Sequence, residues 1–104
     1  MIRPTFSYLG NFTISDTVFR QIIEVVASKQ KGMYKVSRTI IRKEGTDEYN
    51  SGVRIYLEVV VEFGFNIIDV TNTFKKKVRK ELENLTAMNV LDIDILVKNI
   101  HIKQ

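Results

Sequence analysis

The side chains that could do chemistry in this sequence are few and scattered. His101 is the one histidine of the 104 residues, and there is no cysteine. A catalytic base needs a positioned substrate and an orienting partner, and neither is visible around His101, so we expect an ordinary surface histidine. Without cysteine the chain has no thiolate nucleophile and no disulfide. No serine has a nucleophile-elbow context and no phosphate-binding glycine loop occurs, so no enzyme is predicted.

Two aspartates, Asp92 and Asp94, lie two positions apart and therefore on one face of a strand, where they could share a cation or a proton. A zinc site would need further nitrogen or sulfur ligands. A calcium site would need a defined spacing of oxygen ligands, which the loop at 45–52 (GTDEYNSG) lacks. We therefore predict a solvated pair, with no metal, no cofactor and no catalytic residue.

A cationic run at residues 75–80 (KKKVRK) is the remaining candidate site. Lys76, Arg79 and Lys80 fall on the side of a predicted helix away from its apolar residues, and such a face could bind phosphates or anionic lipid headgroups. Solvated lysines on an amphipathic helix are the plainer interpretation. The net charge of +4 leaves the alternative function of an anion- or nucleic-acid-binding module open. RNA binding is not expected, because the outer face of the predicted central strand offers Tyr56 alone among aromatic residues.

The elements that position these residues follow from a change in hydrophobic period. Residues 53–63 alternate, which predicts a half-buried strand at the centre of a sheet. Gly64 ends the alternation, and Asn66 with Asp69 is typical of a capping box that starts a helix. The inward residues of the strand are predicted to be Val53, Ile55, Leu57, Val59, Val61 and Phe63. Those of the helix are predicted to be Val70, Phe74, Val78, Leu82 and Leu85.

The other elements give the fold class. A helix is expected from Ser15 or Asp16 to about Gln30, ended by Gly32, and Asn89 is expected to tolerate a left-handed turn. Strands are expected at 11–14, at 34–43 and at 91–98, with a bulge near Asn99 and a hairpin across the loop at 45–52. The order strand, helix, strand, strand, helix, strand predicts an α+β two-layer sandwich with a mixed sheet and both helices on one face. We expect an N-terminal arm at 1–9 and a single domain at 10–104.

Two surfaces could contact a partner. The apolar residues of the first helix cover roughly half of its circumference, so that either the helix lies deep in the domain, which we favour, or one flank packs against another subunit. The uncovered face of the sheet carries Tyr56, Val60 and Leu96 among charged residues, a mixed patch that suits an interface. No apolar run is long enough to cross a bilayer and no signal peptide is visible, so we expect membrane association to be peripheral or through a partner.

Three segments carry a resemblance to a known family: GNFTISDTVF at 10–19, LEVVVEFGFNIIDV at 57–70 and VRKELENLTAMNVLDIDILV at 78–97. Together they resemble the alkaline shock protein family, also called the general stress protein family, of envelope stress response proteins in Gram-positive-type bacteria. The match includes an aromatic-glycine pair, Phe63-Gly64, at the end of a valine-rich strand. The chain departs from the family pattern at Ile68, where proline is usual, and at Ala87, where glycine is usual.

The resemblance implies a small, cytoplasmic, non-enzymatic protein of envelope stress response and homeostasis. It implies a homo-oligomer that acts through protein contacts and is held near the membrane by a membrane-anchored protein partner. Direct membrane insertion and nucleic-acid binding are not implied, and the resemblance brings no catalytic residue.

Overall fold

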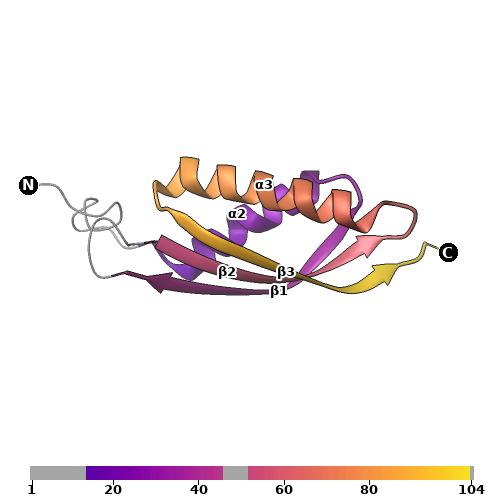
Figure 1. The fold of residues 1–104 in the computed structure, drawn as a ribbon, viewed down its shortest axis with the longest axis horizontal. Coiled ribbons are helices and arrows are strands. Elements are labelled where there is room, and N and C mark those ends of the chain that lie inside the picture. The colour runs from indigo at the N-terminus through magenta and orange to yellow at the C-terminus, as the bar shows by residue number, and fades with distance from the viewer. Residues whose placement is uncertain (1–13, 46–51, 104) are drawn as a thin grey trace, which may run out of the picture.

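The computed structural model of the protein describes residues 14–45 and 52–103 (Figure 1). The elements, in chain order, are α2 (Asp16–Lys29), β1 (Met33–Glu44), β2 (Gly52–Glu62), α3 (Ile67–Thr86) and β3 (Val90–His101). Both helices lie over one face of a three-stranded sheet, which confirms the predicted α+β two-layer sandwich. The expected arm at 1–9 and most of the expected first strand lie outside the described residues. Ile14 is described and belongs to no helix or strand.

The sheet is mixed, and β2 is its central strand. β1 pairs with β2 in antiparallel fashion, as expected for a hairpin, and β2 pairs with β3 in parallel fashion. A parallel pair needs a crossover connection, which α3 provides (Figure 1). The predicted irregularity near Asn99 is confirmed, because Val59 pairs with Val97 and Val60 with Asn99, so that Lys98 is skipped.

The core lies between the sheet and the two helices. The inward residues of β2 from Val53 to Val61 are 0–3% exposed, which confirms the alternation read from the sequence. The fully buried residues that the helices add are Phe19, Ile23, Phe74, Val78 and Leu82. Two predicted core positions are wrong: Phe63 is 70% exposed because β2 ends at Glu62, and Leu85 is 65% exposed.

The predicted end of α2 and the predicted cap of α3 are confirmed, whereas Ser15, the N-cap residue of α2, makes no side-chain cap hydrogen bond. Gln30 caps α2 by donating its backbone N–H to the carbonyl oxygen of Ala27 at 3.1 Å, and Gly32 follows with a φ of +88°. At the start of α3 the Oδ1 atom of Asn66 accepts a hydrogen bond from the backbone N–H of Asp69 at 3.0 Å. This bond satisfies one of the N–H groups that a helix start leaves without a partner.

The left-handed residue after α3 is Ala87, with a φ of 58° and a ψ of 18°, and not Asn89. Its backbone N–H donates to the carbonyl oxygen of Glu83 at 3.0 Å, which closes the last turn. This is the position at which the family resemblance implies glycine. A side chain with a Cβ atom is strained here, because the left-handed conformation brings Cβ close to the following carbonyl oxygen.

We expect Ala87→Gly to raise the free energy of unfolding by about 0.5–1 kcal/mol, because relief of this strain exceeds the extra chain entropy of glycine. Urea denaturation followed by circular dichroism measures the change. Lys76→Gly, at an exposed position in the middle of α3, is the control and should lose roughly 0.5–1 kcal/mol. A loss of stability in Ala87→Gly equal to that of the control would contradict the strain at Ala87.

Candidate interaction surfaces

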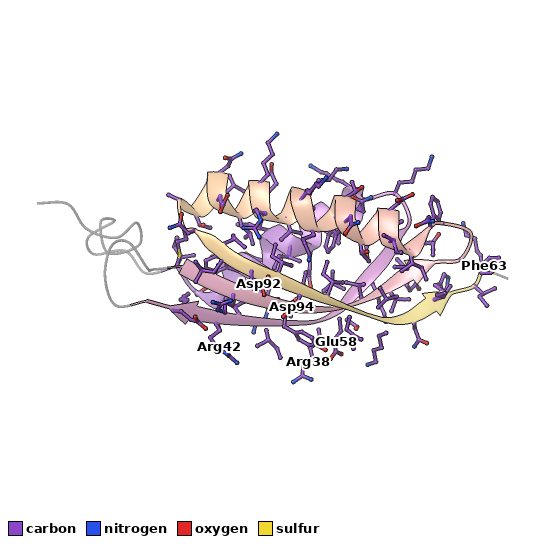
Figure 2. All side chains as sticks on the ribbon, viewed as in Figure 1. Arg38, Arg42, Glu58, Phe63, Asp92 and Asp94 are labelled. Carbon is purple, nitrogen blue, oxygen red and sulfur yellow. The ribbon has the colours of Figure 1, made fainter. Side chains whose placement is uncertain are left out.

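The face of the sheet away from the helices carries rows of charged and apolar side chains. Figure 2 shows Arg38, Arg42 and Glu58 on this side. Strand pairing aligns the residues in rows that run from β1 through β2 to β3: Arg42, Arg54 and Asp92; then Ile40, Tyr56 and Asp94; then Arg38, Glu58 and Leu96. We call this surface the outer sheet face.

The residues of β2 form the middle column of the outer sheet face, and their charges are compensated within the chain. The Nε atom of Arg54 lies 2.9 Å from Oε1 of Glu44, and this hydrogen bond raises the pKa of the Arg54 guanidinium. The hydroxyl of Tyr56 donates to Oε2 of Glu58 at 2.9 Å, which raises the pKa of the Tyr56 phenol because deprotonation would break the bond. Glu58 also lies 3.8 Å from Nη1 of Arg38 and 4.0 Å from Nζ of Lys98.

The two aspartates of β3 point to the outer sheet face, as predicted. They line a shallow hollow of about 190 Å³ together with Ile40, Arg42, Arg54, Ile55 and Tyr56. Among the described residues neither carboxylate has a basic nitrogen within 4.0 Å, and no cluster of three or more acidic or histidine side chains suits a metal ion.

The predicted partner patch is available only in part. Tyr56 is half-buried and Leu96 is 48% exposed, but Val60 is 8% exposed and offers almost no surface. Ile40, at 38% exposure, pairs with Tyr56 and adds the apolar area that Val60 does not. The face on which Ile40 lies could not be predicted from the sequence, because β1 contains two register irregularities.

The predicted basic face of α3 does not form one cluster. Lys76 and Lys80 are exposed, whereas Arg79 is half-buried and its Nη1 atom donates to the carbonyl oxygen of Val90 at the start of β3. Arg79 therefore ties α3 to β3. Lys80 lies beside Lys29 and Lys77, around a hollow between the two helices.

The outward flank of α2 is apolar and open to solvent. Val25 is 52% exposed and Val18 is 39% exposed, while Leu85 of α3 is 65% exposed. With Ile22, these residues form what we call the α2–α3 strip. Two adjoining hollows of about 320 and 180 Å³ run along it, and both are lined by Val25, Val26 and Glu81. The structure thus supports the less favoured of the two interpretations of α2: one side is buried and another flank is free for a partner.

His101 takes part in a ring contact. Its imidazole stacks on the ring of Tyr34, with centroids 3.8 Å apart and the planes at 10°. The two rings come from β1 and β3, the outer strands of the sheet. His101 is partly exposed, so its described contact is one of packing.

In the part of the chain that the structure describes, neither helix is long and apolar enough to cross a membrane. A comparison with curated proteins found no match. Among solved structures the fold is similar to that of MamM CTD variants. One in a nickel form has a TM-score of 0.54 and 10% identity, covering 85% of this chain and 99% of that one. A copper form has a TM-score of 0.55 and 9% identity, covering 86% of this chain and 100% of the other.

Identity this low shows a shared fold and nothing further. The sequence itself is more informative. A family model described as having a cell envelope-related function matches residues 6–102, nearly the whole chain. The three segments that carry the resemblance fall within this range. The described part of the first segment leads into the start of α2, the second covers β2 with the start of α3, and the third covers α3 with β3. The chain belongs to the alkaline shock protein 23 family.

Proposed function

We propose that this protein is a non-enzymatic component of envelope stress response and homeostasis. It acts in the cytoplasm by binding copies of itself and other protein chains, and a membrane-anchored partner holds it near the membrane. The cell envelope-related function of the family supports a role at the cell envelope. The observation that carries the proposal is the exposed α2–α3 strip, because a contiguous apolar surface with a charged border suits a protein interface.

The shape and charge of the strip favour a particular kind of partner. An amphipathic helix laid between α2 and α3 would cover Val25 and Leu85, the two most exposed residues of the strip. Burial of each contributes about 1 kcal/mol. Lys29, Lys77 and Lys80 surround one end of the groove, so acidic residues at one end of the incoming helix would find complementary charge. We assign this groove to an acidic amphipathic helix of the membrane-anchored partner.

We expect Val25→Glu to release the protein from membranes. The substitution places a carboxylate in the middle of the strip, where binding would remove its water, and a loss of 1.4 kcal/mol already weakens binding about tenfold. In cells of the native host, the wild-type chain should sediment with the membrane fraction and Val25→Glu should remain mostly in the supernatant.

Thr17→Glu is the matched control, because Thr17 is exposed on the same helix, lines neither hollow of the strip, and gains the same charge. It should sediment like the wild-type chain. Circular dichroism of the purified variants checks that both are folded. Val25→Glu that still sediments with the membranes, or a wild-type chain found wholly in the supernatant, would rule out this mode of attachment.

A further inference from the structure

The outer sheet face separates its charges by strand. β1 carries Arg38 and Arg42, whose side chains are 62% and 73% exposed, and their ion pairs within the chain are long, at 3.8 and 3.9 Å. β3 carries Asp92 and Asp94, which form no ion pair among the described residues. At the level of the rows of Arg42 and Ile40, one edge of the face is therefore basic and the other acidic, with the compensated middle column between them. Lys98, farther along β3, pairs with Glu58 of that column.

We infer that a second copy of this chain covers the outer sheet face, related to the first by a two-fold axis parallel to β2. Such a rotation places β3 of the second copy over β1 of the first, with the rows of residues at the same level. Arg42 then lies opposite Asp92 of the second copy, since the two residues share a row. Asp94 of the second copy lies opposite Ile40, between Arg38 and Arg42. Two-fold symmetry makes each of these contacts occur twice.

Charge selects this axis over the alternative. A two-fold axis across the strands would place β1 over β1 and bring arginines against arginines, which is unfavourable. With the axis along β2 the middle column meets itself, but its charges are compensated within each chain: Arg54 by Glu44, and Glu58 by Arg38 and Lys98. Tyr56 then meets its own copy near the axis, where two aromatic rings can pack in an offset stack.

The dimensions are sufficient for a weak, specific dimer. Sheets packed face to face lie about 10 Å apart, a gap that a long arginine opposite a short aspartate can fill. Three strands about 4.8 Å apart, with about ten residues at about 3.4 Å each, cover on the order of 500 Å² per copy. The total of about 1,000 Å² is at the lower limit for a specific interface, so we expect dissociation in the micromolar range. The dimer rests on the proposed self-association, and it uses the face opposite to the α2–α3 strip.

The test uses the purified full chain and analytical ultracentrifugation over a range of concentrations. Arg42→Asp sets aspartate against Asp92 of the second copy, and Asp92→Arg sets arginine against Arg42. Each variant alone should therefore dimerise at least tenfold more weakly than the wild-type chain. An equimolar mixture of the two should regain a dimer of wild-type affinity, because both contacts of the mixed dimer again join opposite charges. Lys76→Asp, a charge reversal on the helix side, should dimerise like the wild-type chain.

Each result decides between definite alternatives. Thermal melting by circular dichroism confirms that the variants are folded, and rescue by mixing cannot arise from two unfolded chains. A wild-type dimer that neither variant weakens, or variants that stay monomeric when mixed, would overturn the outer sheet face as the interface and leave self-association standing. A wild-type chain that is monomeric at all concentrations would overturn both, whereas membrane attachment through the α2–α3 strip is tested independently by Val25→Glu.

Discussion

Gly32→Ala should lower the free energy of unfolding by about 3 kcal/mol. Gly32 has a φ of +88°, and a Cβ atom there would lie 2.7 Å from Cγ2 of Val70 and 2.9 Å from Cγ of Phe65. The left-handed conformation costs about 1–2 kcal/mol for a residue with a Cβ atom, and overpacking adds about 1–3 kcal/mol. Urea denaturation measures the loss as a lower midpoint at an unchanged slope.

The size of this effect follows from the place of Gly32 in the fold. The residue joins α2 to β1, and its carbonyl oxygen accepts a hydrogen bond from the backbone N–H of Glu62 at 2.8 Å. That bond fixes the turn against the end of β2, while Val70 on α3 packs over the glycine. A shift of the turn to make room for a methyl group would therefore disturb three elements at once.

Gly64→Ala separates the cost of the left-handed conformation from the cost of overpacking. Gly64 has a φ of +101°, but no heavy atom lies within 4 Å of the position that its Cβ would take. The variant should lose only the conformational part, about 1–2 kcal/mol. Equal losses in the two variants would show that the close approach at Gly32 carries no energy, and would refute our account of the junction.

Local signals in the sequence were sufficient to predict most of the elements. The alternation in β2 and the cap at Asn66 each depend on residues close together in the chain, so they could be read without the fold. For Phe63 and Leu85, these local signals predicted burial and the structure shows exposure. Alternation assigned Phe63 to the core, but β2 ends at Glu62 and the chain turns at Gly64, two residues later, so the Phe63 ring is left in solvent.

Leu85 was misplaced for a related reason. The buried residues of α3 recur strictly every fourth position from Val70, so Thr86 takes the place that a leucine was expected to fill. Burial of a threonine requires partners for its hydroxyl. The Thr86 hydroxyl donates to the carbonyl oxygen of Leu82 and accepts from the backbone N–H of Met88 at 3.2 Å. These contacts depend on the turn at Ala87, which the spacing of apolar residues does not encode.

The candidate surfaces were less predictable than the elements, because they depend on strand register. The row that joins Arg42, Arg54 and Asp92 brings together three strands that are distant in the sequence. From the sequence, only the members on β2 and β3 could be assigned to a face, because apolar and polar residues alternate along these two strands. In β1 the irregularities at Tyr34 and Ser37 shift the pattern, so the arginines of the basic edge could not be placed. The opposition of a basic and an acidic edge is a property of the folded sheet.

Phe74→Ala should lower the free energy of unfolding by about 3–5 kcal/mol, since Phe74 is 0% exposed and its removal leaves a cavity between α3 and the sheet. The matched variant is Phe63→Ala, which removes the same side chain where it is 70% exposed and should change stability by less than about 0.5 kcal/mol. Urea denaturation of both variants measures the contrast. A comparable loss in both would mean that the Phe63 ring is packed in solution, against the structure. A difference of several kcal/mol would show that the ring of Phe63, unlike that of Phe74, contributes little to the core and is a large apolar side chain carried at the surface.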